Sequence, residues 1–251
     1  MRRFIAYVGT ALVVLIAGCG GSADPSADPT ASPTVNPLAA LEAQFVAKRG
    51  VKVSEIQETH VDGELFNNGN RDGVVQFSGI GVDGYDITMK TELMDAPIRT
   101  LAIGSSSYQS GGTIADVLPD GKKWRKSESE PGKRTPFFTP MLILEPATLK
   151  AVLATMAKQS GGVYEGTITL GALHAVSPSF QAEDLTDTRE AALVMSWRMS
   201  VGLDGLPTRL VTSYSDPEYT LGPLEKKSDI RFSSWGTPVE LASPPEKETS
   251  T

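Results

Sequence analysis

Apolar and polar side chains alternate with a period of two over much of this chain, and this alternation constrains the fold more than any other feature. In the clearest segment, serine, arginine and glycine alternate with Met195, Trp197, Met199, Val201 and Leu203. Asp204-Gly205 then predicts a two-residue hairpin turn, after which residues 206–214 alternate again. Because successive side chains of a strand point to opposite faces, the pattern predicts an antiparallel hairpin with one face toward water.

Six more segments have the composition or the alternation of strands, which brings the expected number to about eight. They cover residues 51–61, 74–80, 85–93, 98–105, 163–170 and 230–235. The short connections between neighbouring segments favour antiparallel pairing.

Two helices are also predicted. The first begins at Pro37 after the N-cap residue Asn36 and ends before Gly50, and the second runs from Glu145 to about residue 160 with Leu149, Val152, Leu153 and Met156 on one stripe. The expected fold class is therefore α+β: a curved antiparallel sheet, a half-barrel of about eight strands, wrapped around two or three α-helices.

The first residues have the three parts of a secretory signal. Arg2 and Arg3 precede an apolar run over residues 4–17, which is too short for a stable membrane-spanning helix. Ile16-Ala17-Gly18-Cys19 resembles the bacterial lipobox, so we expect residues 1–18 to be removed and Cys19 to carry fatty-acyl chains such as palmitate. The expected location is the extracytoplasmic face of the cell membrane, with the Cys19 lipid as anchor.

Composition divides the rest of the chain. Residues 19–35 are small and polar and predict a disordered tether of roughly 20–25 Å. We expect residues 36–242 to form the folded half-barrel domain and residues 243–251 to form a disordered tail.

Removing residues 1–18 takes away two arginines and no acid, so the net charge changes from −7 to −9. An acidic domain excludes nucleic acid as a partner. The single cysteine excludes an internal disulfide.

No pattern of catalytic or metal-binding residues stands out. The two histidines, His60 and His174, have no ligand-forming neighbours, and the Ser105-Ser106-Ser107 run lacks the glycine spacing of a nucleophile elbow. We expect no metal, no cofactor and no enzymatic activity. An envelope hydrolase that uses residues distant in sequence is the weakest alternative.

Several segments together resemble a known family of lipoproteins. After the lipobox and tether come Ser107-Tyr108, residues 121–126 (GKKWRK), 164–167 (YEGT), 201–209 (VGLDGLPTR) and 232–245 (FSSWGTPVELASPP). This order is similar to the actinobacterial LppX/LprG-type lipoproteins, which are related in fold to the LolA and LolB lipoprotein carriers. The resemblance implies a half-barrel with a hydrophobic cavity for the acyl chains of envelope lipids or lipoglycans, and no enzyme.

Two functional hypotheses follow. The first is a membrane-anchored envelope lipoprotein that binds or transfers a lipid or acylated molecule in a cavity lined by Ile87, Met89, Met195, Trp197 and Met199. The same side chains are also typical of a packed core. The second hypothesis is therefore a sensor, accessory or interaction protein of the envelope that has a filled core and no ligand but an envelope protein as partner.

Overall fold

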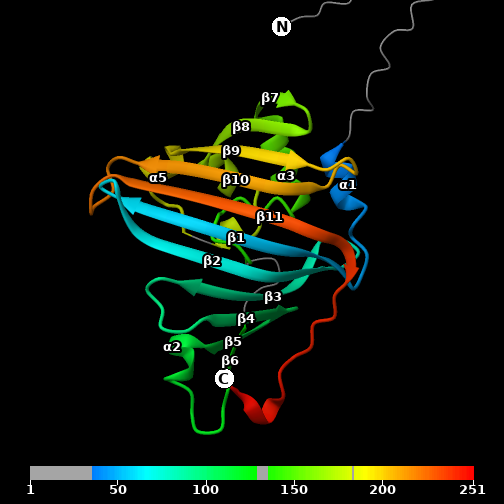
Figure 1. Cartoon of the computed structure of the whole chain (residues 1–251), viewed down its shortest axis with the longest axis vertical. Coiled ribbons are helices and arrows are strands. Elements are labelled where there is room, and N and C mark those ends of the chain that lie inside the picture. Colours follow the sequence, from blue (N-terminus) through cyan, green and yellow to red (C-terminus); the bar gives the residue numbers. More distant parts are fainter. Residues whose placement is uncertain (1–35, 129–134, 183) are drawn as a thin grey trace, which may run out of the picture. The chain divides into compact units, whose positions relative to one another are not determined.

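The computed structural model describes residues 36–128, 135–182 and 184–251, and these build one large curved sheet of 12 strands (Figure 1). The strands are β1 (Arg49–Val61), β2 (Glu64–Phe77), β3 (Val82–Thr91), β4 (Ile98–Ile103), β5 (Ser106–Gly111), β6 (Trp124–Glu128), β7 (Met156–Ser160), β8 (Val163–Thr169), β9 (Val194–Val201), β10 (Pro207–Asp216), β11 (Leu224–Pro238) and β12 (Thr249–Ser250).

The sheet consists of two meanders that meet in the middle. Its order is β12-β6-β5-β4-β3-β2-β1-β11-β10-β9-β8-β7, so β1 to β6 extend to one side and β7 to β11 return from the other. The antiparallel pair β1 and β11 joins the two halves, with Val53 opposite Phe232 and Glu55 opposite Ile230. All neighbours are antiparallel except β12 and β6, which are parallel.

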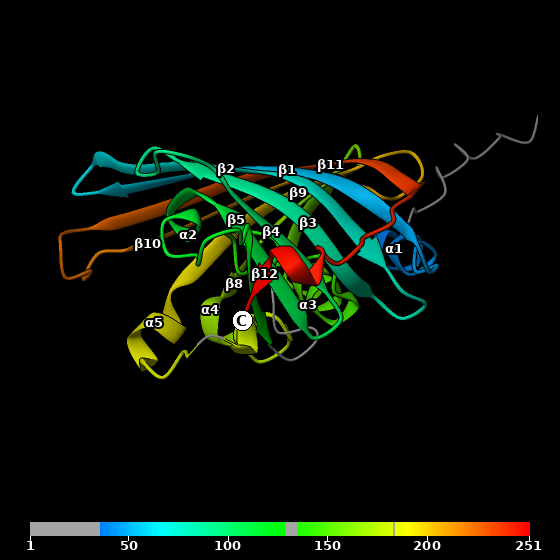
Figure 2. The same ribbon diagram turned by 90° about the horizontal axis from the view of Figure 1, so that it is seen from below.

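The helices are short and lie mainly on one face, called here the inner face. They are α1 (Pro37–Glu42), α2 (Gly112–Ala115), α3 (Pro146–Ala154), α4 (Leu170–His174) and α5 (Thr188–Ala192), with the 3-10 turns η1 (Phe180–Ala182) and η2 (Glu246–Glu248). Figure 2 shows α3, α4 and α5 on the same side of the sheet. Within the described ranges, no helix is both long enough and apolar enough to span a bilayer.

The expected fold class was wrong in its proportions. An open sheet of 12 strands with edges at β12 and β7 replaces the half-barrel of about eight strands wrapped around two or three helices. The missing strands are β5, β6, β7 and β12. They are short and polar, and they lie at or near the two edges of the sheet, so they show little of the apolar alternation on which the prediction depended.

Both predicted helices are present but shorter than expected. Asn36 caps α1 by accepting hydrogen bonds from the backbone N–H groups of Leu38 and Ala39 at 3.1 and 3.3 Å, and the helix ends at Glu42. The second helix, α3, ends at Ala154, and Met156 belongs to the exposed strand β7. In both cases the apolar spacing continued past the true end of the helix.

The Asp204-Gly205 hairpin is confirmed, with one difference in its loop. β9 pairs with β10 as expected, but the N–H of Gly202 donates to the carbonyl of Leu206 at 2.9 Å, so the loop has three residues instead of two. Leu203 therefore lies in the loop and is exposed, although the alternation placed it on the strand.

Residues 243–251 are ordered, contrary to the expected disordered tail. The N–H of Lys123 donates to the carbonyl of Glu248 at 2.8 Å, and β12 then pairs with β6. Further back, the N–H of Leu241 donates to the side chain of Gln76 at 3.2 Å. The C-terminal segment thus covers part of the sheet instead of ending the domain at residue 242.

Candidate ligand-binding site

The core of the C-terminal half of the sheet is filled. Met195, Trp197 and Met199 are almost wholly buried beneath α3 and α4, together with Leu149, Val152, Leu170 and Leu173. The Trp197 indole N–H donates to Thr155 Oγ1 at 3.2 Å, and its ring lies where a side chain at Gly166 would be. These three predicted cavity residues therefore contribute to packing, and the pocket that Met195 borders measures only about 20 Å³.

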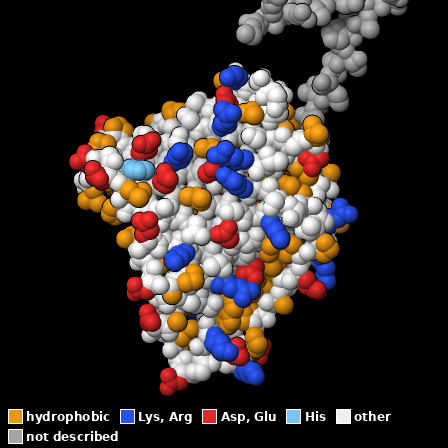
Figure 3. Space-filling view, in the orientation of Figure 1, with side chains coloured by type: hydrophobic (Ala, Val, Ile, Leu, Met, Phe, Trp, Pro, Cys, Tyr) orange, Lys and Arg blue, Asp and Glu red, His pale blue; other side chains and the backbone are white. Residues whose placement is uncertain are grey.

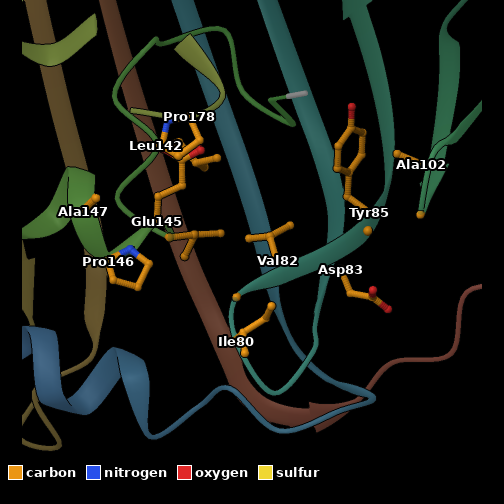
Figure 4. Close-up of a pocket in the computed structure, with 14 residues that line it drawn as sticks. Ile80, Val82, Asp83, Tyr85, Ala102, Leu142, Glu145, Pro146, Ala147 and Pro178 are labelled. Atoms are coloured by element: carbon orange, nitrogen blue, oxygen red, sulfur yellow. The ribbon is translucent and has the colours of Figure 1, made fainter. Parts of the chain in front are cut away.

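The N-terminal half contains open space on its inner face. A pocket of about 210 Å³, called here the apolar pocket, lies between the β3–β4 region and the start of α3. Its walls include Ile80, Val82, Tyr85, Ala102, Leu142, Leu144, Pro146, Ala147 and Pro178. Figure 4 shows Val82 and Ile80 on one side, with Leu142 and Pro146 across from them.

An exposed apolar side chain marks the mouth of the apolar pocket. Ile80 lies in the turn between β2 and β3 and is 90% exposed. Ser78 stabilises this turn, because its hydroxyl donates to the carbonyl of Gly81 at 3.2 Å and accepts from the N–H of Ile80 at 3.3 Å. Ile80 therefore offers apolar surface at the entrance of the pocket.

The floor of the apolar pocket belongs to an irregular segment, residues 135–145, called here the inner loop. Phe137, Met141, Leu142, Ile143 and Leu144 of this loop are all buried against the inner face. Such a buried loop needs partners for its backbone polar groups.

Two carboxylates hold the inner loop in place. Glu55 of β1 accepts from the N–H groups of Phe138 and Thr139 at 2.6 and 3.1 Å, and from Ser228 Oγ at 2.5 Å. Burial raises the pKa of Glu55, while the bonds from Ser228 and Phe138 partly offset that rise.

Glu145, at the other end of the loop, accepts from the N–H of Ser179 at 2.9 Å and from the hydroxyls of Thr148 and Ser177, each at 2.7 Å.

A second pocket lies beside the first and is polar. It measures about 330 Å³, and Ile87 and Met89, two of the predicted cavity residues, line it with Arg71, Tyr85, Thr100, Ser107, Gln109, Ser127, Thr135 and Pro136. Tyr85 lines both pockets. We call this second space the polar pocket. Of the five predicted cavity residues, two therefore line the polar pocket, and the other three are buried in the core.

The residues considered for catalysis are not brought together. His60 lies on β1 opposite Glu225, whereas the ring of His174 packs edge-on against Phe180 at 5.2 Å. Gly104 and Ser105 form the turn before β5, as expected for a connection between strands. In the part of the chain that the structure describes, no three His, Cys, Asp or Glu residues form a group that could hold a metal ion.

The outer face of the sheet is charged and solvated. Figure 3 shows Lys, Arg, Asp and Glu side chains interspersed over the face turned toward the viewer in Figure 1. Cross-strand ion pairs join Arg209 to Asp229 at 2.6 Å and Arg198 to Glu165 at 2.6 Å. The pockets described above lie on the opposite face.

The main functional residues that sequence reasoning missed belong to the inner loop. Residues 137–144 contain a nearly continuous apolar run beside Pro136 and Pro140, which is a detectable signal for a buried segment. The run has no periodicity of a helix or strand, and nothing in it indicates that Glu55, some 80 residues earlier, binds its backbone.

Comparisons with known proteins give no family for this chain. No protein-family model matches the sequence, and no curated protein matches it either. A LolA superfamily protein from Nitrosomonas europaea is similar in structure with a TM-score of 0.32 and 11% identity over 86% of this chain and 96% of that one. A DUF1329 family protein from Desulfovibrio piger gives a TM-score of 0.27 and 8% identity over 82% and 92%. Since such low TM-scores do not establish a common fold, the functional conclusions rest on the geometry of this chain.

Proposed function

We propose that the protein binds a single acyl chain in the apolar pocket of its N-terminal half. The observation that carries this proposal is a pocket of about 210 Å³ whose walls are mostly aliphatic and whose mouth is bordered by the exposed Ile80. A half-open, mostly apolar space with exposed apolar surface at its entrance favours an apolar ligand over a polar one.

The volume limits the size of the ligand. An engineered cavity of about 150 Å³ accepts benzene, whereas pockets for drug-sized molecules measure roughly 300–1,000 Å³. A pocket of about 210 Å³ lies between these and suits one chain, or part of one. A lipid with several acyl chains would leave the others outside the pocket.

Burial of methylene groups supplies the binding energy. Each CH₂ removed from water contributes about 0.8 kcal/mol, so six would contribute roughly 5 kcal/mol. When the acyl chain comes from a membrane, whose interior is equally apolar, the free energy of transfer into the pocket is close to zero. Exchange with a bilayer is therefore reversible, as a carrier or receptor of acylated molecules requires.

We also propose that Cys19 anchors the protein to the extracytoplasmic face of the membrane. The support is the lipobox-like sequence, since residues 1–35 lie outside the described ranges. Metabolic labelling with radioactive palmitate should label the wild-type chain and leave Cys19→Ser unlabelled. Label retained on Cys19→Ser would contradict the anchor.

The acyl-chain proposal is tested by mass spectrometry of the full-length Cys19→Ser chain, purified without detergent from its own envelope. A co-purifying single-chain amphiphile in about equimolar amount supports the proposal. A matched preparation of Ala147→Trp, which narrows the pocket, should lose it. Lys150→Trp, at an exposed residue of the same helix that is not in the pocket lining, should retain it. An amphiphile that all three proteins retain equally would contradict binding in this pocket.

A second candidate function is an interaction with another envelope protein. The tips of two neighbouring hairpins expose Leu65, Phe66, Tyr219 and Leu221, and the N–H of Asp62 donates to the carbonyl of Pro223 at 2.8 Å between them. Acidic residues such as Glu64 and Glu218 border these side chains, which suits an apolar partner surface with basic residues at its edge. Crosslinking in cells from position 66 would capture one defined protein in this case.

A further inference from the structure

Arg71 of β2 is an arginine on the inner face of the sheet, in the wall of the polar pocket. Strand pairing places it directly opposite Glu55 on one side and Met89 on the other. Its guanidinium stacks on the ring of Phe138 from the inner loop, with 3.8 Å between the guanidinium carbon and the ring centroid. The planar group is therefore held in one orientation.

The hydrogen-bonding capacity of Arg71 is largely unused by the residues that the structure describes. One guanidinium nitrogen donates to the sulfur of Met89 at 3.7 Å, which is a weak bond, and no carboxylate among the described residues forms an ion pair with Arg71. A guanidinium has five N–H donors. The remaining donors border the open volume of the polar pocket.

The surroundings keep the charge of Arg71 only partly compensated. Desolvation lowers its pKa, and the nearby charge of Glu55 raises it, yet an arginine stays protonated in either case. The oxygens of Glu55 are occupied by Phe138, Thr139 and Ser228. Among the described residues that line the polar pocket, none is acidic, and Thr100, Ser107, Ser127 and Thr135 carry hydroxyls.

We propose that Arg71 binds the anionic headgroup, a carboxylate or a phosphate monoester, of the amphiphile whose chain occupies the apolar pocket. This inference rests on the proposed function. A planar guanidinium matches the two oxygens of either group, and the neighbouring hydroxyls donate further hydrogen bonds.

The two pockets are close enough for one molecule to occupy both. Tyr85 lines both pockets, while Ile87, two residues further along β3, lines only the polar one. Two residues of a strand span roughly 6–7 Å, the length of a few methylene groups. The same holds on β4, where Ala102 lines the apolar pocket and Thr100, two residues earlier, lines the polar pocket.

The test compares ligands of equal chain length and different headgroup. Dodecanoate, dodecyl phosphate and 1-dodecanol are titrated into the full-length Cys19→Ser chain by isothermal calorimetry. We expect both anions to bind roughly ten- to a hundredfold more tightly than the alcohol, as is typical of a charge-assisted hydrogen bond. Arg71→Gln should bring the anions to the affinity of the alcohol and leave the alcohol unchanged.

Two controls separate a headgroup role from a structural one. Arg99→Gln removes an arginine on the outer face that pairs with Asp86, and it should keep the full preference for anions. Arg71→Lys keeps the charge without the planar fork and should retain part of the preference. Inorganic phosphate alone should not displace dodecanoate, because it lacks the chain.

The outcomes distinguish this inference from the proposed function. Equal affinity of the wild-type chain for the anions and the alcohol would overturn the role of Arg71 but not the binding of a chain in the apolar pocket. This measurement does not depend on whether any variant folds. A preference that survives in Arg71→Gln would also overturn it. No binding of any of the three ligands would overturn both proposals.

Discussion

The two halves of the sheet are similar meanders that are covered differently. In the C-terminal half, α3 and α4 pack on the inner face and leave Met199 with no exposed surface. In the N-terminal half, the inner loop covers the face only in part and leaves Met89 half-buried beside a pocket of about 330 Å³. The uneven distribution of short helices therefore leaves open space on the inner face of the N-terminal half.

A single row of side chains crosses both halves and shows where the change occurs. Strand pairing aligns, one per strand from β9 to β3, Met199, Leu210, Ile230, Glu55, Arg71 and Met89. Residues directly opposite each other on neighbouring strands point to the same face. The buried Glu55 and the partly buried Arg71 thus lie at the border between the filled core and the open half, where Glu55 holds the inner loop and Arg71 lines the polar pocket.

The largest expected effect comes from making the same substitution at both ends of this row. Met199→Ala should lower the free energy of unfolding by about 2–5 kcal/mol, because it leaves a void in a filled core. Met89→Ala should lower it by about 1 kcal/mol, because its side chain already borders open space. Urea denaturation of both variants measures the difference, and equal losses would contradict the contrast between the halves.

The carboxylate at the border should have the next largest effect. Glu55→Gln replaces one accepting oxygen by an NH₂ group, which cannot accept the bond from the inner loop or from Ser228, so we expect a loss of about 1–3 kcal/mol in unfolding free energy. Glu58→Gln, three positions further along β1 and on the opposite face, should change it by less than about 0.5 kcal/mol. Similar unfolding midpoints for the two variants would argue against Glu55 as the support of the loop.

A charge placed in the apolar pocket should reduce binding with little effect on folding. In Val82→Asp, the new carboxylate must lose its bound water when an acyl chain enters the pocket, so the affinity for dodecanoate should fall at least about tenfold. The free energy of unfolding should change by about 1 kcal/mol or less. Thr88→Asp, exposed on the outer face of the same strand, should bind as the wild type does. Unchanged binding by Val82→Asp would remove the apolar pocket as the site.

A smaller effect should appear in the pH dependence of stability. Because burial raises the pKa of Glu55 above its ordinary value of 4.5, the folded chain retains this proton at a higher pH than the unfolded chain does. The part of the stability that depends on this proton is complete below the unfolded pKa and is lost as pH rises through the folded pKa. The stability difference between the wild type and Glu55→Gln should narrow over this range in denaturant titrations. A difference that widens with pH would reverse the assigned direction.

The sequence predicted what depends on local pattern. All eight expected strands have counterparts, and the hairpin between β9 and β10 forms because alternation and Asp204-Gly205 agree locally. The short strands at and near the edges were missed because pairing with their neighbours determines their conformation, and their own composition does not. β12 is the extreme case, since two residues near the end of the chain pair with β6.

The candidate site depends on which distant segments of the chain cover each strand, and the local alternation of apolar and polar residues does not encode this. Met195, Trp197 and Met199 have the same alternation as Tyr85, Ile87 and Met89, yet helices cover only the first group. Arg71 was not selected because a single arginine in a polar strand is ordinary until the sheet turns it toward a pocket. Residue type alone therefore could not separate core from cavity.

The most direct test of the contrast between the halves is photo-crosslinking with dodecanoic acid that carries a diazirine at its terminal carbon, followed by peptide mass spectrometry of the full-length Cys19→Ser chain. With the headgroup at Arg71, we expect the label on residues of the apolar pocket, such as Val82 and Leu144, at about one label per chain. A label on β9 beside Met195 or Met199, or on the hairpin tip at Phe66, would contradict the account.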